Sequence, residues 1–196
     1  MIDLTGLKCA LADMQMLDWG TVLEPPLGGV SQRIDRIGTR FAQSFRTPAM
    51  RIEADGRRAI ALLQMAKQQG AKVLYPQPDF NIGAPGSPVV SGAHTGGTAL
   101  AITGAQPNYT VRLGQALSLT VGGRSYLHFA GAETVLNASG AGTITLTTPM
   151  RKHLAGAEPV NLAAPVMEGW LAGSELPWTL EISRSVGLEF TVTERA

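Results

Sequence analysis

Apolar and polar residues alternate in RFAQSFR, residues 40–46. Phe41 and Phe45 are apolar whereas positions 40, 44 and 46 are polar, and this period of two is typical of a strand with one buried face. The Thr47-Pro48 step that follows interrupts such a strand, because proline restricts the residue before it and donates no backbone hydrogen bond. The pattern predicts a half-buried strand over residues 40–46.

A helical period follows in EADGRRAIALLQMAKQQG, residues 53–70. Its apolar residues recur at spacings of three and four, as on one helix face: Ala59, Ile60, Leu62, Leu63 and Ala66. Gly70 is a suitable C-terminal stop, with Lys67 in the last turn. KVLYP, residues 72–76, predicts a strand directly afterwards, so residues 40–76 are expected to form a strand, a helix and a strand, with the helix packed on a sheet.

Proline, glycine and small polar residues dominate residues 77–98, which predict a linker or an extended loop. Short apolar runs with glycines between them then follow at intervals of about 8–12 residues, a pattern typical of a small antiparallel barrel or sandwich. Gly122 and Gly123 lie between LSLTV and RSYLHF and predict a two-residue hairpin turn, because glycine reaches positive φ without strain. NASGAG, residues 137–142, predicts a similar turn before TITLTTP.

The two ends of the sequence are predicted to meet in one sheet. The first segment alternates irregularly and breaks at Pro25-Pro26 and Gly28-Gly29, which predicts two strands joined by a long loop. WTLEI and GLEFTVTE, with a bend over residues 185–187, predict a closing hairpin. We expect this hairpin to pair with strands of the first segment, which makes the barrel an insertion.

These patterns predict a mainly β fold of the α+β class, with an antiparallel β-sheet core, one packed α-helix and a small inserted β-barrel. The chain has 196 residues and is 44% hydrophobic, which is enough to bury such a core. We expect a sheet-and-helix core over residues 1–80, a Gly/Pro-rich linker arm over 81–104, a small antiparallel barrel over 105–165, and C-terminal strands that return to the core over 166–196.

Composition narrows the classes of partner. The net charge is +1 and the 16 lysines and arginines are scattered, so no nucleic-acid contact is predicted. No apolar stretch approaches the roughly 20 residues that cross a bilayer, and residues 1–20 lack a signal-peptide pattern, so we expect a soluble, unexported chain without a membrane partner. The single cysteine, Cys9, permits no intrachain disulfide and fits a reducing cytoplasm.

No motif for a metal ion or a nucleophile is present in the sequence. His94, His128 and His153 lie far apart, and none has a ligand or a base at a recognised offset. Cys9 is expected to be a small buried side chain rather than a nucleophile. The GxSxG pattern of serine hydrolases does not occur.

Neither the glycine-rich stretches nor the carboxylates form a recognised binding or catalytic motif. SGAHTGGTALAIT, residues 91–103, leads into a predicted strand, whereas a phosphate-binding loop leads into a helix. Glu53 and Asp55 lie at a helix start, where the macrodipole accounts for them, and Asp13 and Asp18 match no motif. Paired carboxylates of a glycoside hydrolase are placed by the fold, so spacing leaves that alternative open. We predict no catalytic, cofactor-binding or metal-binding residue, no cofactor and no enzymatic activity.

The order of these pieces resembles the distal tail or baseplate proteins of long-tailed bacteriophages. In that family a strand ending in Thr-Pro precedes a helix, a strand with a P-x-P-D turn follows, and a V-x-G-A-x-x-T-G passage introduces a small barrel with a Gly-Gly hairpin. The resemblance covers roughly residues 40–195 and is weak before them. The matching stretches are Arg40–Met50, Tyr75–Phe80, Val90–Gly97, Gly114–Tyr126 and Thr143–Arg151.

The resemblance implies a structural virion protein at the tail tip, in a ring that links the tail tube to the tip complex. The implied partners are further copies of this chain in a homo-oligomeric ring built on residues 1–80, with six-fold symmetry, the tail tube protein, and the tail hub with other tip proteins. Assembly is expected in the host cytoplasm. Residues 20–39 and 77–98 are suited to be arms that become ordered on assembly.

A second hypothesis is a binding module at the tail tip whose barrel recognises a host carbohydrate or receptor. Trp170, Trp178 and Tyr126 are its candidate platforms. Core packing is the commoner role for Trp178 and Tyr126, because both lie in predicted strands. A third hypothesis, a cell-wall hydrolase, lacks any constellation of catalytic residues in the sequence.

Overall fold

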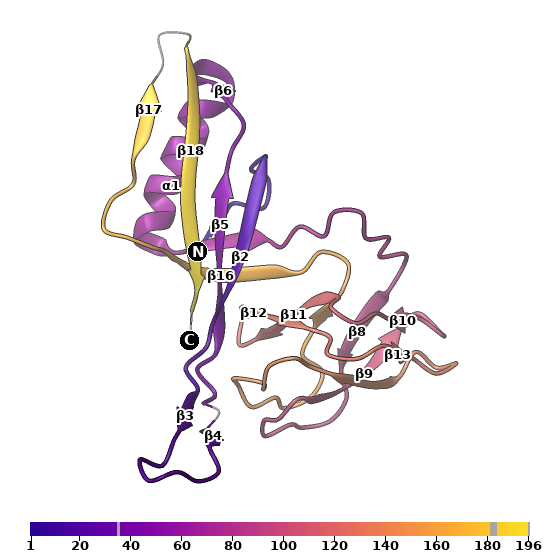
Figure 1. Ribbon diagram of the computed structural model, residues 1–196. Helices are drawn as coiled ribbons and strands as arrows, with labels where there is room; N and C mark the ends of the chain where they lie inside the picture. The colour runs from indigo at the N-terminus through magenta and orange to yellow at the C-terminus, as the bar shows by residue number, and fades with distance from the viewer. Residues whose placement is uncertain (35, 181–183, 196) are drawn as a thin grey trace.

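A mainly antiparallel sheet with helix α1 packed on one face forms the core of the protein (Figure 1). The computed structural model describes residues 1–34, 36–180 and 184–195. The main strands occur in the spatial order β1 (Ile2–Asp3), β7 (Ala71–Leu74), β16 (Val166–Leu171), β18 (Ser185–Glu194), β5 (Arg40–Arg46) and β2 (Leu11–Leu17). Two further strands, β17 (Trp178–Leu180) and β6 (Met50–Arg51), pair with the first half of β18. The predicted mainly β fold with one packed helix is confirmed, but the sheet is mixed because β1 and β7 run parallel.

Strand β5 coincides with the strand predicted from residues 40–46. Phe41 and Phe45 are buried as expected, and the ring of Phe45 stacks on that of Phe190 at 5.1 Å between centroids. Ala42 and Gln43 are buried as well. The strand is more than half-buried because it lies inside the sheet, between β18 and β2.

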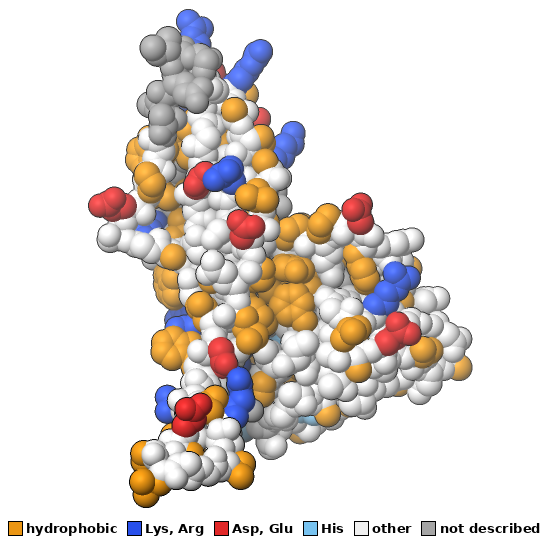
Figure 2. All heavy atoms as spheres, in the orientation of Figure 1, with side chains coloured by type: hydrophobic (Ala, Val, Ile, Leu, Met, Phe, Trp, Pro, Cys, Tyr) orange, Lys and Arg blue, Asp and Glu red, His pale blue; other side chains and the backbone are white. Residues whose placement is uncertain are grey.

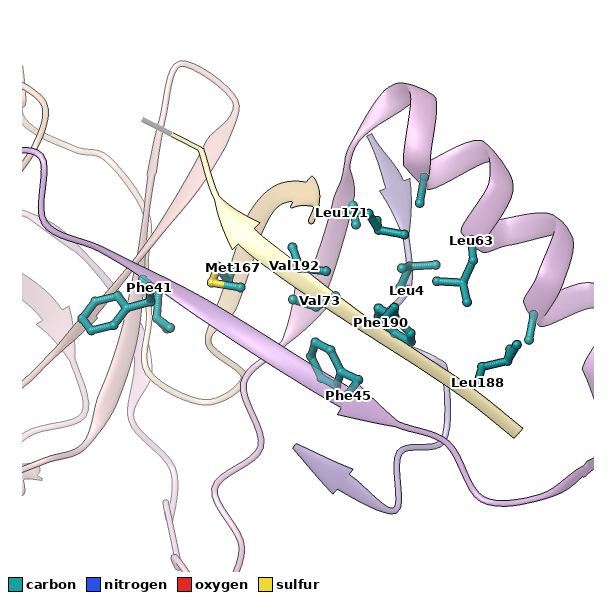
Figure 3. Packing of buried hydrophobic residues seen from close by; sticks show 14 of the residues in the cluster. Leu4, Phe41, Phe45, Leu63, Val73, Met167, Leu171, Leu188, Phe190 and Val192 are labelled. Atoms are coloured by element: carbon teal, nitrogen blue, oxygen red, sulfur yellow. The ribbon is translucent and has the colours of Figure 1, made fainter. Parts of the chain in front are cut away.

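Helix α1 (Arg57–Gln69) confirms the predicted helix and follows a single π-helical turn, η1 (Ile52–Gly56). Ala59, Leu63 and Ala66 are fully buried against the sheet, and Figure 3 shows Leu63 facing the strand side chains. Gly70 ends the helix at φ 81°, a conformation that favours glycine. No helix among the described residues is long and apolar enough to cross a membrane.

The inserted unit consists of three small sheets. One contains β14 (Gly142–Thr145), β9 (Ala99–Ala105) and β8 (Gly86–Val90), and another contains β12 (Arg124–Phe129), β11 (Ala116–Val121) and β15 (Val160–Asn161). The third pairs β10 (Thr110–Val111) with β13 (Thr134–Val135). These sheets share a second hydrophobic core, but the described strands do not close into the predicted barrel. The two three-stranded sheets are linked by isolated bridges, Val89 with Pro159 and Ala130 with Leu146, rather than by continuous ladders.

The predicted hairpin at Gly122 and Gly123 is confirmed. Val121 pairs with Arg124, and the two glycines have φ values of 57° and 76°. Positive φ at both central residues is the geometry of a type I′ turn, which matches the twist of the flanking strands.

Strands β8 and β9 begin inside residues 81–104, where a linker arm was expected. Strand β8 was not predicted because Pro88 and the glycines of this segment are typical of loops. An edge strand such as β8 tolerates proline, because the backbone on its open side makes no hydrogen bond to a neighbouring strand. β18 pairs with β5 and β16, so the chain does return to the core after the insertion. The predicted bend over residues 185–187 is wrong, since these residues belong to β18, and residues 181–183 lie outside the described part.

Candidate functional site: a projecting arm and a buried clamp

A hairpin arm, residues 18–39, extends beyond the end of the β2–β5 pair (Figure 1). Its strands β3 (Thr21–Leu23) and β4 (Gln32–Ile34) are antiparallel, with Thr21 opposite Ile34. The sequence predicted a long loop here, and the structure adds this short ladder to it. The tip between β3 and β4 carries the two prolines and two glycines noted in the sequence.

Asp18 fastens the base of the arm. Its carboxylate accepts hydrogen bonds from the Gly20 amide at 2.8 Å, the Arg33 guanidinium at 2.7 Å and the Thr39 hydroxyl at 3.2 Å. The Gly20 amide and then the Arg33 side chain lower the pKa of Asp18, so it is ionised at neutral pH. These three hydrogen bonds, called the Asp18 lock below, join both strands of the arm to the start of β5. They limit the directions in which the arm can extend.

The tip of the arm exposes apolar side chains. Leu27 is 97% exposed and Val30 is 93% exposed, and Figure 2 shows hydrophobic side chains gathered at the end of this projection. Exposed large hydrophobic residues continue along the arm: Trp19, Val22, Leu23, Ile34 and Ile37. A concentration of exposed apolar side chains on one projecting element is typical of a surface that contacts another molecule.

Strand β2 is an open edge of the sheet. It pairs with β5 along its whole length, and its other side pairs with no strand among the described residues. Met16 is exposed on this edge, whereas Asp13 supplies a charge that discourages unspecific pairing. Since β2 leads directly into the arm, the edge and the arm form one continuous surface.

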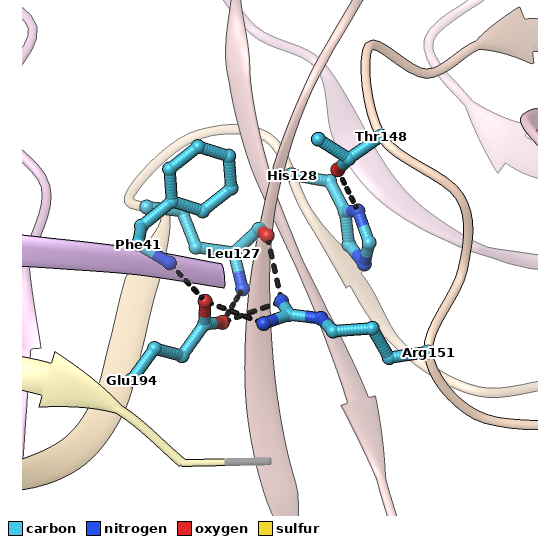
Figure 4. Close-up of polar contacts among 6 residues, drawn as sticks. All are labelled: Phe41, Leu127, His128, Thr148, Arg151 and Glu194. Atoms are coloured by element: carbon cyan, nitrogen blue, oxygen red, sulfur yellow. Dashed lines mark hydrogen bonds and ion pairs between the residues drawn. The ribbon is translucent and has the colours of Figure 1, made fainter. Parts of the chain in front are cut away.

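A buried ion pair clamps the inserted unit to the sheet (Figure 4). The two terminal nitrogens of the Arg151 guanidinium, Nη1 and Nη2, each lie 2.6 Å from a Glu194 carboxylate oxygen, and the two side chains are 6% and 0% exposed. The carboxylate also accepts hydrogen bonds from the amides of Phe41 (3.1 Å) and Leu127 (2.8 Å). The clamp therefore connects β18, β5 and β12.

Aromatic packing supports the clamp. Phe129 of β12 lies edge-on to Phe41 of the sheet, with 5.0 Å between ring centroids, and edge-on to Tyr75 at 5.2 Å. Such pairs stabilise beyond their buried area by about 0.5–1.5 kcal/mol each. The clamp and this cluster together fix the orientation of the inserted unit relative to the sheet.

His128 lies beside the clamp and is fully buried, with its Nδ1 3.3 Å from the Thr148 hydroxyl. Burial and then the positive charge of Arg151 lower its pKa to about 3, so the ring is neutral at physiological pH. His94 is joined to Leu154 through backbone bonds, and His153 is exposed. No three histidine, cysteine or acidic side chains gather at metal-binding distance within the described residues.

The aromatic residues of the carbohydrate hypothesis do not form one platform. Tyr126 is buried, as its predicted core role requires, while Trp170 and Trp178 are both 41% exposed. Trp178 pairs with Leu188 and Trp170 pairs with Thr193 of the same strand. Because positions 188 and 193 point to opposite faces of β18, the two tryptophans lie on opposite faces of the sheet.

Two residues differ from what the sequence pattern predicts: Cys9 in its burial and Asp18 in its role. Cys9 is exposed rather than buried, and partial desolvation raises the pKa of its thiol, so it is not an activated nucleophile. Asp18 matched no motif, although the order Asp-Trp-Gly is typical of an aspartate that bonds the backbone two residues on. Arg151 and Glu194 carried no comparable signal, because they are paired only by the fold.

Comparison with models of known protein families gives no match, and comparison with curated protein sequences gives none either. The role of the arm, the open edge and the clamp is therefore inferred from their geometry and from the pattern of the sequence.

Proposed function

We propose that the chain is a structural subunit of a bacteriophage tail, in a distal tail or baseplate ring that joins the tail tube to the tip complex. The observation that carries this proposal is the projecting arm, whose tip exposes Leu27 and Val30 almost completely. Removing apolar surface from water lowers the free energy, so these exposed side chains favour contact with another molecule. The strand order and turn glycines that resemble phage distal tail proteins point in the same direction.

The open edge at β2 supports contacts between identical subunits. The sheet ends at β2 on one side and at the short strand β1 on the other, so its two edges differ. Contacts between two different surfaces of identical subunits are heterologous, and they close into a ring when the rotation between neighbours permits. Six subunits is the number that the resemblance implies.

The clamp suits a subunit that has neighbours above and below its ring. An inserted unit in a fixed orientation presents its surface to the tail tube or to the tip proteins at a constant angle. A catalytic role has less support, because burial raises the pKa of the Cys9 thiol and no three histidine, cysteine or acidic side chains gather at metal-binding distance among the described residues. The carbohydrate-binding alternative also has less support, since Trp170 and Trp178 lie on opposite faces of the sheet and cannot form one aromatic platform.

A substitution at the tip of the arm tests the proposal. We expect Leu27→Asp to abolish ring formation with little change in the free energy of unfolding, because this side chain makes almost no contact within its own chain. Native mass spectrometry and negative-stain electron microscopy, with and without the tail tube protein as a template, measure the assembly.

The matched control is Leu113→Asp, which alters a residue of the inserted unit that is 69% exposed. This control variant should assemble like the unaltered chain. A ring that forms equally well with Leu27→Asp, or an unaltered chain that stays monomeric even with the tube protein, would contradict the proposal.

A further inference from the structure

Strand β2 has the longest unpaired side of any strand in the described part of the chain. It pairs with β5 through all seven residues on one side, and no described strand pairs with its other side. The next longest strand with a single partner strand is β12, with six residues. The outer amide and carbonyl groups of an edge strand can form sheet hydrogen bonds with an extended chain that lies alongside. The occupant that fits this edge is therefore another strand of similar length.

The sequence of β2 has the same pattern of polarity in both directions. LADMQML, residues 11–17, contains two apolar residues, one polar residue, the central Met14, one polar residue and two apolar residues. Antiparallel pairing reverses the order of one strand relative to the other. A strand with this palindromic pattern is matched by a second copy of itself, related by a two-fold axis.

The match is complete when Met14 lies opposite Met14 of the second copy. Apolar residues then face apolar residues in the pairs Leu11–Leu17, Ala12–Met16 and Met14–Met14. Asp13 faces Gln15 of the second copy, whose amide is a hydrogen-bond donor for the carboxylate. Leu11 and Met16 are 47% and 56% exposed in the single chain, and the pairing covers part of this apolar surface.

The charge of Asp13 disfavours the competing registers. Asp13 is the single charged residue of β2. An antiparallel register centred on Asp13 places the two copies of this carboxylate opposite each other, and a parallel in-register pair places them side by side. Like charges in these positions are destabilising. A register centred on Gln15 puts Asp13 opposite Leu17 and leaves Leu11 outside the pairing, so the register centred on Met14 is the best matched.

We infer that two free copies of the chain join their β2 strands in this antiparallel register and form one continuous sheet. The two-fold axis runs through the Met14 pair and keeps both α1 helices on the same face of the joined sheet. The arm of each copy follows Leu17, so the two arms extend from opposite ends of the junction (Figure 1). The inference goes beyond the proposed ring, because it concerns the chain before assembly.

The pair and the proposed ring use the same edge of the sheet. A subunit whose β2 is held by a second copy cannot give that edge to a neighbour in the ring. If the proposed function holds, the pair is therefore a resting form that protects the edge from unspecific pairing and opens before the ring assembles.

A disulfide across the two-fold axis tests the inference. Residues directly opposite in an antiparallel pair have Cα atoms about 4.5–5.5 Å apart, which lies within the range that a disulfide spans. Cys9→Ser removes the only native cysteine. In this background we expect Met14→Cys to form a covalent dimer on mild oxidation, seen on a denaturing gel without reductant.

The matched controls are Leu11→Cys and Leu17→Cys in the same background. Each control alone should stay monomeric on the gel, because its two copies lie at opposite ends of the junction, roughly 20 Å apart. An oxidised mixture of the two controls should give the covalent dimer, since Leu11 faces Leu17 of the second copy. A mixture that gives no covalent dimer would contradict the register.

Charge variants at Gln15 give an independent readout, because residue 15 faces Asp13 twice across the two-fold axis. Gln15→Asp should raise the dissociation constant of the pair about two- to tenfold, and Gln15→Lys should lower it by a similar factor. Sedimentation equilibrium measures this constant. The same two changes at Gln106, an exposed residue of the inserted unit, should leave it unaltered. A shift in the same direction for Gln15→Asp and Gln15→Lys would place residue 15 away from Asp13.

The outcomes separate the pair from the ring. A chain that stays monomeric at every accessible concentration, or a dimer that Met14→Cys does not cross-link, would overturn the inference and leave the proposed ring standing. A covalent Met14→Cys dimer that assembles no ring with the tube protein, even after reduction, would contradict the proposed function and leave the pair standing. Ring formation by the oxidised dimer without reduction would overturn its role as a resting form.

Discussion

The ion pair between Arg151 and Glu194 acts at the scale of single residues. Both side chains are buried, and the carboxylate receives two backbone amides in addition to the guanidinium. A buried pair of this kind adds little net stability when compared with apolar replacements, but the loss of one partner leaves an uncompensated charge inside the protein. The pair therefore makes the contact between inserted unit and sheet specific in its geometry.

Arg151→Ala should lower the free energy of unfolding by about 3–5 kcal/mol, because Glu194 then stays buried without its cation. Urea unfolding measures the change. The neighbouring Lys152→Ala, which alters an exposed side chain, should stay within about 0.5 kcal/mol of the unaltered chain. Equal stability of both variants would show that the clamp does not hold the two units together.

His128 makes stability depend on pH. The unfolded histidine takes up a proton as the pH falls through 6.5, whereas the folded ring stays neutral until about 3. The unfolded state thus binds more protons in this window, and the free energy of unfolding should fall as the pH is lowered from 6.5, with a slope that approaches about 1.4 kcal/mol per pH unit.

Urea unfolding between pH 6.5 and 5 checks this slope before most carboxylates titrate. His128→Leu should flatten the slope whatever its absolute stability, and the exposed His153→Leu should leave it unchanged. An equally steep slope in His128→Leu would assign the pH dependence to other groups.

Single residues differ in how far the sequence predicts them. The burial of Phe41 and Phe45 follows from local alternation, because a strand presents every second side chain to the same face. The pairing of Arg151 with Glu194 depends on the return of β18 across the sheet, so no local pattern indicates it.

At the scale of elements, the arm has little internal support. Its ladder of β3 and β4 is short, and the Asp18 lock holds only its base. The sequence predicted an arm here from its prolines and glycines. The ladder could not be predicted, because TVL and QRI are too short to show a clear hydrophobic period. Strand β8 could not be predicted either, because Pro88 is unusual inside a strand.

Limited proteolysis tests the state of the arm. In the free subunit we expect the first cuts within residues 20–39, with chymotrypsin at Leu23 or Leu27, because exposed tips with few contacts open readily. In the assembled ring the same bonds should be protected. First cuts in the inserted unit, with the arm intact, would indicate that the arm is held firmly within its own subunit.

At the scale of the whole molecule, a sheet built from both ends of the chain carries an inserted unit in a fixed orientation. The insertion was predictable, because alternation near both ends indicated strands that could pair. The parallel pair of β1 and β7 was not predictable, since a strand of two residues has no period. The open set of small sheets differs from the predicted barrel because closure depends on contacts between strands, which spacing along the chain does not specify.

The central claim is that this chain forms a ring at the distal end of a bacteriophage tail. Immunogold electron microscopy of tailed particles that contain the chain, with an antibody raised against it, tests the claim most directly. The account predicts label at the distal tip of each tail and none along the tube. Label along the whole tube, or particles without label, would contradict it.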